Sequence, residues 1–178
     1  MLKLMIGVVI ATVIVIFAFS VINNNIGPMA NSGSSIQIVD DSFMTMTITG
    51  QVVKPGSYVM KKEDTIGDLL LAAGGTTSNA DSRAFIEETS LVKGVSYYIA
   101  PINDLNDYCG EQALEKYNVN TGSKEELMKI KGVGSQIATD IIAYRTENGE
   151  FTYLEALQKV RGIGKSTFES IKNYVILR

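Results

Sequence analysis

The sequence predicts a multi-part protein with an N-terminal transmembrane helix, a small α+β domain and an all-α domain built from a repeated hairpin. Three observations support this prediction: residues 4–22 carry no charge, residues 44–101 mix strand and helix patterns, and K-G-V-G at 131–134 returns as R-G-I-G at 161–164. The expected parts are a transmembrane anchor at 1–22, a linker at 23–43, the α+β domain at 44–101, a linker at 102–117 and the all-α domain at 118–178.

The first part is predicted from an uncharged apolar run between Leu4 and Ile22, whose length is close to the roughly 20 residues that a helix needs to cross a bilayer. A cleaved secretory signal is the alternative, but its apolar region is typically about 7 to 15 residues long. Lys3 precedes the run and no Lys or Arg follows it until Lys54. We therefore expect a single-pass protein of the cell membrane, with a cytoplasmic N-terminus and extracellular C-terminal domains.

The composition excludes most hydrolytic chemistry. The chain has no histidine and one cysteine, Cys109, so it lacks the residues for most zinc sites, for a Ser-His-Asp triad and for an internal disulfide. Cys109 is expected to lie inertly in the second linker, with an intermolecular disulfide as the alternative. The sequence predicts no catalytic residue, no metal site and no cofactor.

Charge divides the rest of the chain. Residues 36–115 contain 5 basic and 12 acidic residues, whereas residues 116–178 contain 10 basic and 7 acidic residues, although the whole chain has a net charge of -3. A basic C-terminal part on an otherwise acidic chain indicates a segment that binds a polyanion.

The α+β domain is predicted from its alternation and its turn residues. Met44, Met46 and Ile48 alternate with threonines, which is typical of a strand, and Tyr58 and Val59 begin a second strand. The sequence at 54–56 is Lys-Pro-Gly, which predicts a turn with a left-handed glycine at Gly56. A later strand is expected at 95–100.

A short helix lies between these strands in the prediction. Asp64 or Thr65 can cap it, and Gly74 suits the left-handed position after its end. Its apolar face is expected to contain Ile66, Leu69, Leu70 and Ala73. The strings ITGQVVKPGSYVM, LLLAAGGTT and YYIAP resemble the soluble-ligand-binding β-grasp (SLBB) domain across most of residues 46–101. The alternative for this domain is a spacer without a ligand of its own.

The last domain repeats at an offset of thirty residues. Each copy contains a candidate capping box, a short helix, a glycine-containing turn and a second helix. The candidate boxes are Ser123 with Glu126 and Thr152 with Glu155. The apolar residues expected in the first helices are Leu127 and Ile130, and Leu154, Leu157 and Val160; in the second helices they are Ile137, Ile141 and Ile142, and Phe168, Ile171 and Val175.

The two glycine turns predict a pair of phosphate sites. Glycine on either side of one apolar residue lets the backbone turn sharply and approach a ligand, while Val133 or Ile163 anchors the turn in the core. The helix that follows directs its unpaired N–H groups and its dipole to the same place. The candidate phosphate-binding residues at and near these turns are Lys131, Gly132, Val133, Gly134, Ser135, Gln136, Arg161, Gly162, Ile163, Gly164, Lys165, Ser166 and Lys172.

Duplication strengthens this prediction, since one glycine-rich turn between helices is usually only a turn. A pseudo-twofold pair presents two phosphate sites in opposite senses, which matches the antiparallel strands of a duplex. Such a module contacts the backbone and reads little sequence.

Residues 118–175 resemble the tandem helix-hairpin-helix module of ComEA-type competence DNA receptors, and the order of parts is similar to that of the whole receptor. The resemblance implies a non-enzymatic receptor that captures double-stranded DNA outside the cell and delivers it to an uptake channel protein, for transformation or for nutrition. It also implies self-association through the SLBB-like domain.

Two other classes of protein are alternatives to such a receptor. A helix-hairpin-helix glycosylase or nuclease is disfavoured, because only fourteen residues follow Gly164 and no metal-type carboxylate cluster accompanies the hairpins. The other is an SLBB-led envelope interaction protein, for example one associated with polysaccharide export, in which the hairpins serve only for packing.

Overall fold

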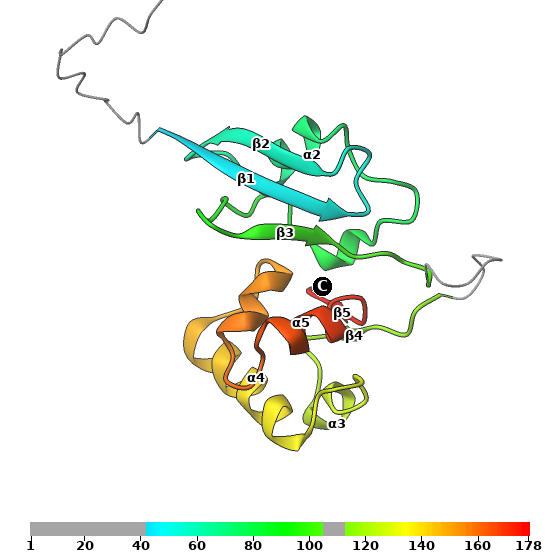
Figure 1. Cartoon of the computed structure of the whole chain (residues 1–178). Coiled ribbons are helices and arrows are strands. Elements are labelled where there is room, and N and C mark those ends of the chain that lie inside the picture. The colour runs from blue at the N-terminus through cyan, green and yellow to red at the C-terminus, as the bar shows by residue number, and fades with distance from the viewer. Residues whose placement is uncertain (1–41, 105–112) are drawn as a thin grey trace, which may run out of the picture. The chain divides into compact units, whose positions relative to one another are not determined.

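The computed structural model describes residues 42–104 and 113–178 (Figure 1). The expected transmembrane segment at 4–22, the linker that follows it up to residue 41, and Cys109 lie outside the described residues. None of the helices in the described ranges has the length and apolar character needed to span a bilayer. The description below concerns these two described ranges.

Residues 42–104, here the first module, contain a three-stranded sheet in the order β2-β1-β3 (Figure 1). Strand β1 (Phe43–Gly50) pairs antiparallel with β2 (Gly56–Lys61) and parallel with β3 (Ser96–Ile99). The alternation seen in the sequence has the expected cause, because Met44, Met46 and Ile48 are buried. The three predicted strands are thus confirmed.

Helix α2 (Ile66–Ala72) covers the buried face of this sheet. Thr65 is its N-cap, and a reciprocal capping box joins it to Asp68. Ile66, Leu69, Leu70 and Ala73 are all buried, as the sequence predicts, and Gly74 has a φ of 80°. A short 3-10 helix η1 (Ser82–Ala84) follows, with Asp81 as its N-cap.

The predicted turn at 54–56 is wrong in one respect. Gly56 does not have a left-handed φ; it is the first residue of β2 and pairs with Ile48. The left-handed glycine is instead Gly50, at the end of β1, with a φ of 85°. A Cβ atom there would lie 2.2 Å from the carbonyl oxygen of Ile99. The bend therefore begins where β1 leaves the sheet.

Residues 113–178, here the second module, contain the repeated helical hairpins. The first copy consists of α3 (Lys124–Leu127) and α4 (Ser135–Asn148), and the second of the 3-10 helix η2 (Leu154–Lys159) and α5 (Lys165–Ile171). The prediction of an all-α domain is incomplete, because β4 (Tyr117–Asn118) and β5 (Val175–Ile176) form a parallel two-stranded sheet. Val175, expected on the last helix, starts β5 and is buried there.

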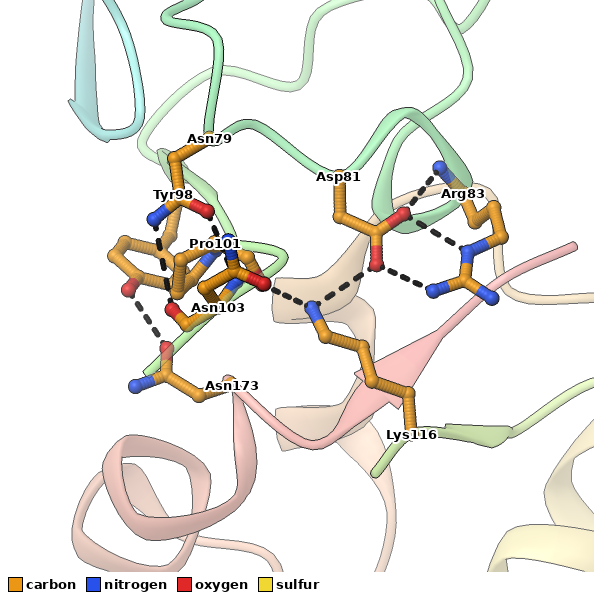
Figure 2. A network of polar contacts seen from close by, with 8 residues as sticks. All are labelled: Asn79, Asp81, Arg83, Tyr98, Pro101, Asn103, Lys116 and Asn173. Atoms are coloured by element: carbon orange, nitrogen blue, oxygen red, sulfur yellow. Dashed lines mark hydrogen bonds and ion pairs between the residues drawn. The ribbon is translucent and has the colours of Figure 1, made fainter. Parts of the chain in front are cut away.

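The two modules are joined by polar contacts that centre on Asp81 (Figure 2). Arg83 donates to both carboxylate oxygens of Asp81 at 3.0 and 2.9 Å, and the Lys116 ammonium lies 3.1 Å from Oδ2. Lys116 also donates to the carbonyl oxygen of Pro101. Burial alone would raise the pKa of Asp81, but the hydrogen bonds from Arg83 and Lys116 outweigh it and lower the pKa to about 2.

Candidate nucleic-acid interface

The two glycine hairpins have the same backbone course. Gly132 and Gly162 have φ values of 100° and 88°, which only glycine adopts readily. One residue later, the N–H of Val133 donates to the carbonyl oxygen of Ile130 at 2.9 Å. The corresponding bond in the second copy, from Ile163 to Val160, measures 3.1 Å. The repeat read from the sequence is therefore a repeat of conformation.

The second glycine of each hairpin has a different role. Gly134 and Gly164 have φ values of -85° and -81°, a conformation open to any residue. A Cβ atom added at either position would meet nothing within 4 Å. Neither the backbone angles nor the packing of the described residues requires glycine here. The space beside each of these glycines is open, so another molecule can approach the backbone closely.

Each of these glycines is also the N-cap of a helix. The carbonyl oxygen of Gly134 accepts from the N–H of Ala138 at 2.9 Å, and that of Gly164 accepts from Phe168 at 2.9 Å. Neither N-cap provides a side-chain hydrogen bond. The N–H groups of the first turns of α4 and α5 therefore keep their capacity to bind an acceptor, and they add partial positive charge at both hairpins.

The hairpins are anchored in one core. Val133 and Ile163 are 4% and 1% exposed. A Cβ at Gly132 would lie 3.9 Å from Cγ2 of Ile171 on α5, and a Cβ at Gly162 would lie 3.2 Å from Cγ1 of Ile137 on α4. Each hairpin thus packs against the second helix of the other copy. This reciprocal packing fixes the two open backbone sites relative to each other.

The polar candidates around the hairpins are largely exposed. Lys131 and Arg161 precede the turns, and Ser135, Gln136, Lys165 and Ser166 follow them. Gln136 donates to Asp140 on the same helix at 3.1 Å. These side chains can supply hydroxyl, amide and ammonium groups to an anion held by the backbone.

Lys172 differs from the other candidates. It is half-buried, forms an ion pair with Glu169, and its Nζ lies 4.0 Å from the ring centroid of Tyr98 in the first module. The structure thus brings the other predicted residues to the two hairpins and places Lys172 beyond the far end of α5.

The two predicted capping boxes have different outcomes. The first is confirmed, because the side chains of Ser123 and Glu126 each accept from the other's backbone N–H. The second is wrong: the N-cap of η2 is Tyr153, and Glu155 is buried. Its Oε1 accepts from the backbone N–H of Tyr98 at 2.6 Å. Sequence reasoning missed this contact, and no local pattern signals it.

Comparison with known proteins agrees with this geometry. The sequence matches the helix-hairpin-helix motif family over residues 112–176 and the SLBB domain family over residues 45–100. It is 35% identical over 146 residues to "ComE operon protein 1" of Bacillus subtilis (strain 168), covering 76% of this chain and 70% of that protein. The chain belongs to the ComEA-type family. This DNA-binding family is non-enzymatic.

Shorter similarities cover about a third of this chain. A protein of Xenopus laevis called "Endonuclease/exonuclease/phosphatase family domain-containing protein 1" is 41% identical over 58 residues, which are 33% of this chain and 10% of that protein. An uncharacterized protein of Haemophilus influenzae is 38% identical over 63 residues, which are 35% of this chain and 56% of that protein. Because the match covers only 10% of the Xenopus protein, it does not indicate that this ComEA-type chain has the activity in that protein's name.

Proposed function

We propose that this protein is a membrane-anchored, extracytoplasmic receptor that binds double-stranded DNA without sequence specificity, for DNA uptake in competence and transformation. The observation that carries the proposal is the pair of hairpins with matched conformation, each with an exposed glycine backbone in open space. Membership of the ComEA-type family supports the same function.

Binding follows from the chemistry of the two turns. In each, backbone N–H groups at Gly134 or Gly164 and the residue after it donate to phosphate oxygens, and the missing side chain lets the DNA backbone approach. Because the reciprocal packing fixes both sites, one hairpin binds each strand of the duplex. Lys131, Arg161 and Lys165 add charge-assisted contacts.

The remaining parts of the proposal concern placement and partners. Residues 4–22 anchor the chain in the membrane, so that the DNA-binding module lies outside the cell. The SLBB-like module links several copies, which multiplies weak contacts along one duplex. A DNA-uptake channel protein then receives the DNA.

Salt provides the first test. If about four phosphates are neutralised, the association constant should fall with roughly the 3.6th power of salt concentration. We expect the affinity of the purified full-length chain for a mixed-sequence duplex to drop about a hundredfold between about 50 and about 200 mM salt. Fluorescence anisotropy with duplexes of unrelated sequence measures this slope. Absent or salt-insensitive binding, or strong preference for one sequence, would contradict the proposal.

A further inference from the structure

Tyr98 of strand β3 is held from three sides by the second module. Its backbone N–H donates to Oε1 of Glu155 at 2.6 Å. Its hydroxyl donates to Oδ1 of Asn173 at 2.7 Å, as Figure 2 shows. The ammonium of Lys172 lies over its ring. The free edge of β3 is thus covered by side chains from the second copy of the repeat.

These three partners bracket the second hairpin. Glu155 lies on η2, which precedes the hairpin, while Lys172 and Asn173 directly follow α5. Helix α5 has only seven residues, and a helix this short has little stability without tertiary contacts. The contacts to Tyr98 therefore hold both flanks of the segment that carries Gly164.

The first hairpin has no equivalent contact among the described residues. At the offset of thirty residues, the glutamate that corresponds to Glu155 is Glu125, which is exposed in the first turn of α3. The two copies thus use the same residue type differently: Glu125 is exposed to solvent, whereas Glu155 is buried and joins the two modules. The longer α4, with fourteen residues, needs less outside support.

We propose that Tyr98 and Glu155 are positioning residues for DNA binding, through which the SLBB module holds the second hairpin in register with the first. This inference rests on the proposed DNA-binding function. It means that the first module contributes to the affinity of each single chain for DNA, independently of any association between chains.

Glu155 also makes this contact sensitive to pH. Burial raises the pKa of Glu155 to about 7, although its hydrogen bonds and the nearby Lys172 oppose the shift and Glu169 adds to it. Burial raises the pKa of Tyr97 on β3 to about 12, and the charges of Tyr153 and Glu155 add to this shift. The buried Glu155 binds a proton more readily than a solvated glutamate does. Its burial against Tyr98 is therefore most stable below a pH of about 4.5, and this stability is lost as the pH rises through about 7.

The test compares Tyr98→Ala, Glu155→Ala and Glu155→Gln in the full-length chain in a mild detergent. Glutamine keeps an oxygen that accepts from the Tyr98 N–H but cannot ionise. Tyr58→Ala is the matched control, because this tyrosine lies on β2 and its hydroxyl bonds to Lys54 within the first module. Duplex affinity is measured near pH 5 and pH 8 at fixed salt, and amide hydrogen exchange is measured without DNA.

We expect both alanine variants to bind DNA about tenfold more weakly, with faster exchange at residues 162–168 and unchanged exchange at residues 131–137. Glu155→Gln should match the wild type near pH 5 and bind more tightly than it near pH 8. The inference is overturned if the alanine variants keep wild-type affinity and exchange, or if glutamine is as harmful as alanine. Absence of DNA binding by the wild type would contradict the proposed function, and the exchange data would still decide whether Tyr98 holds the hairpin.

Discussion

Replacing Gly134 and Gly164 together by leucine is expected to weaken duplex binding at least about a hundredfold while leaving the protein folded. Both positions have ordinary φ values and open space where a Cβ atom would lie, so the fold has no reason to reject a side chain there. A leucine at each would keep phosphates away from the backbone N–H groups, and each charged hydrogen bond lost is worth about 1.5–3 kcal/mol. Anisotropy titrations measure the affinity, and a thermal melt checks the fold.

Two sets of variants make this result interpretable. Ala143→Leu places the same leucine side chain at an exposed position of α4 and should leave DNA binding unchanged. Leucine at Gly132 and Gly162, in contrast, should lower the melting temperature, because these glycines have left-handed φ values. Normal DNA binding by a folded Gly134→Leu/Gly164→Leu variant would remove the case for the hairpins as the site. It would favour an envelope protein in which they serve only for packing.

Features that depend on neighbouring residues could be predicted from the sequence. The alternation in β1, the capped helix α2 and the conformation of both glycine turns follow from residues within one or two turns of each other. The repeat at an offset of thirty also located the candidate site, because similar turns with buried Val133 and Ile163 arise from similar local sequences. The left-handed Gly132 and Gly162 fit the same explanation.

Features that depend on distant partners could not be predicted. Val175 continues an apolar helical pattern, yet it leaves the helix because β5 pairs with β4 from the start of the module. Glu155 has the spacing of a capping residue, yet it bonds to Tyr98 on a strand of the other module. In both cases the tertiary partner decides between two locally acceptable structures, and the sequence around the residue contains no trace of that partner.

The buried charges between the modules lead to the largest expected effect on stability. Asp81→Ala should lower the free energy of unfolding by about 3–5 kcal/mol, the usual cost of leaving one member of a buried ion pair alone. The side chains of Asp81 and Lys116 are 3% and 2% exposed. The substitution also removes the N-cap of η1 and the two bonds from Arg83. Urea unfolding of the full-length chain measures the change.

A double variant separates the ion pair from the other roles of Asp81. With Lys116→Met already present, Asp81→Ala should cost clearly less, because no buried ammonium is then left without its carboxylate. Acid gives an independent check on the same group. Because the pKa of Asp81 is lowered from 3.8 to about 2, its contribution of about 2 kcal/mol is present above a pH of about 3.8 and is lost as the pH falls through about 2. Equal costs in both backgrounds would show that Asp81 acts through its cap and Arg83 rather than through Lys116. A wild type and an Asp81→Ala variant with parallel acid profiles would contradict the lowered pKa of Asp81.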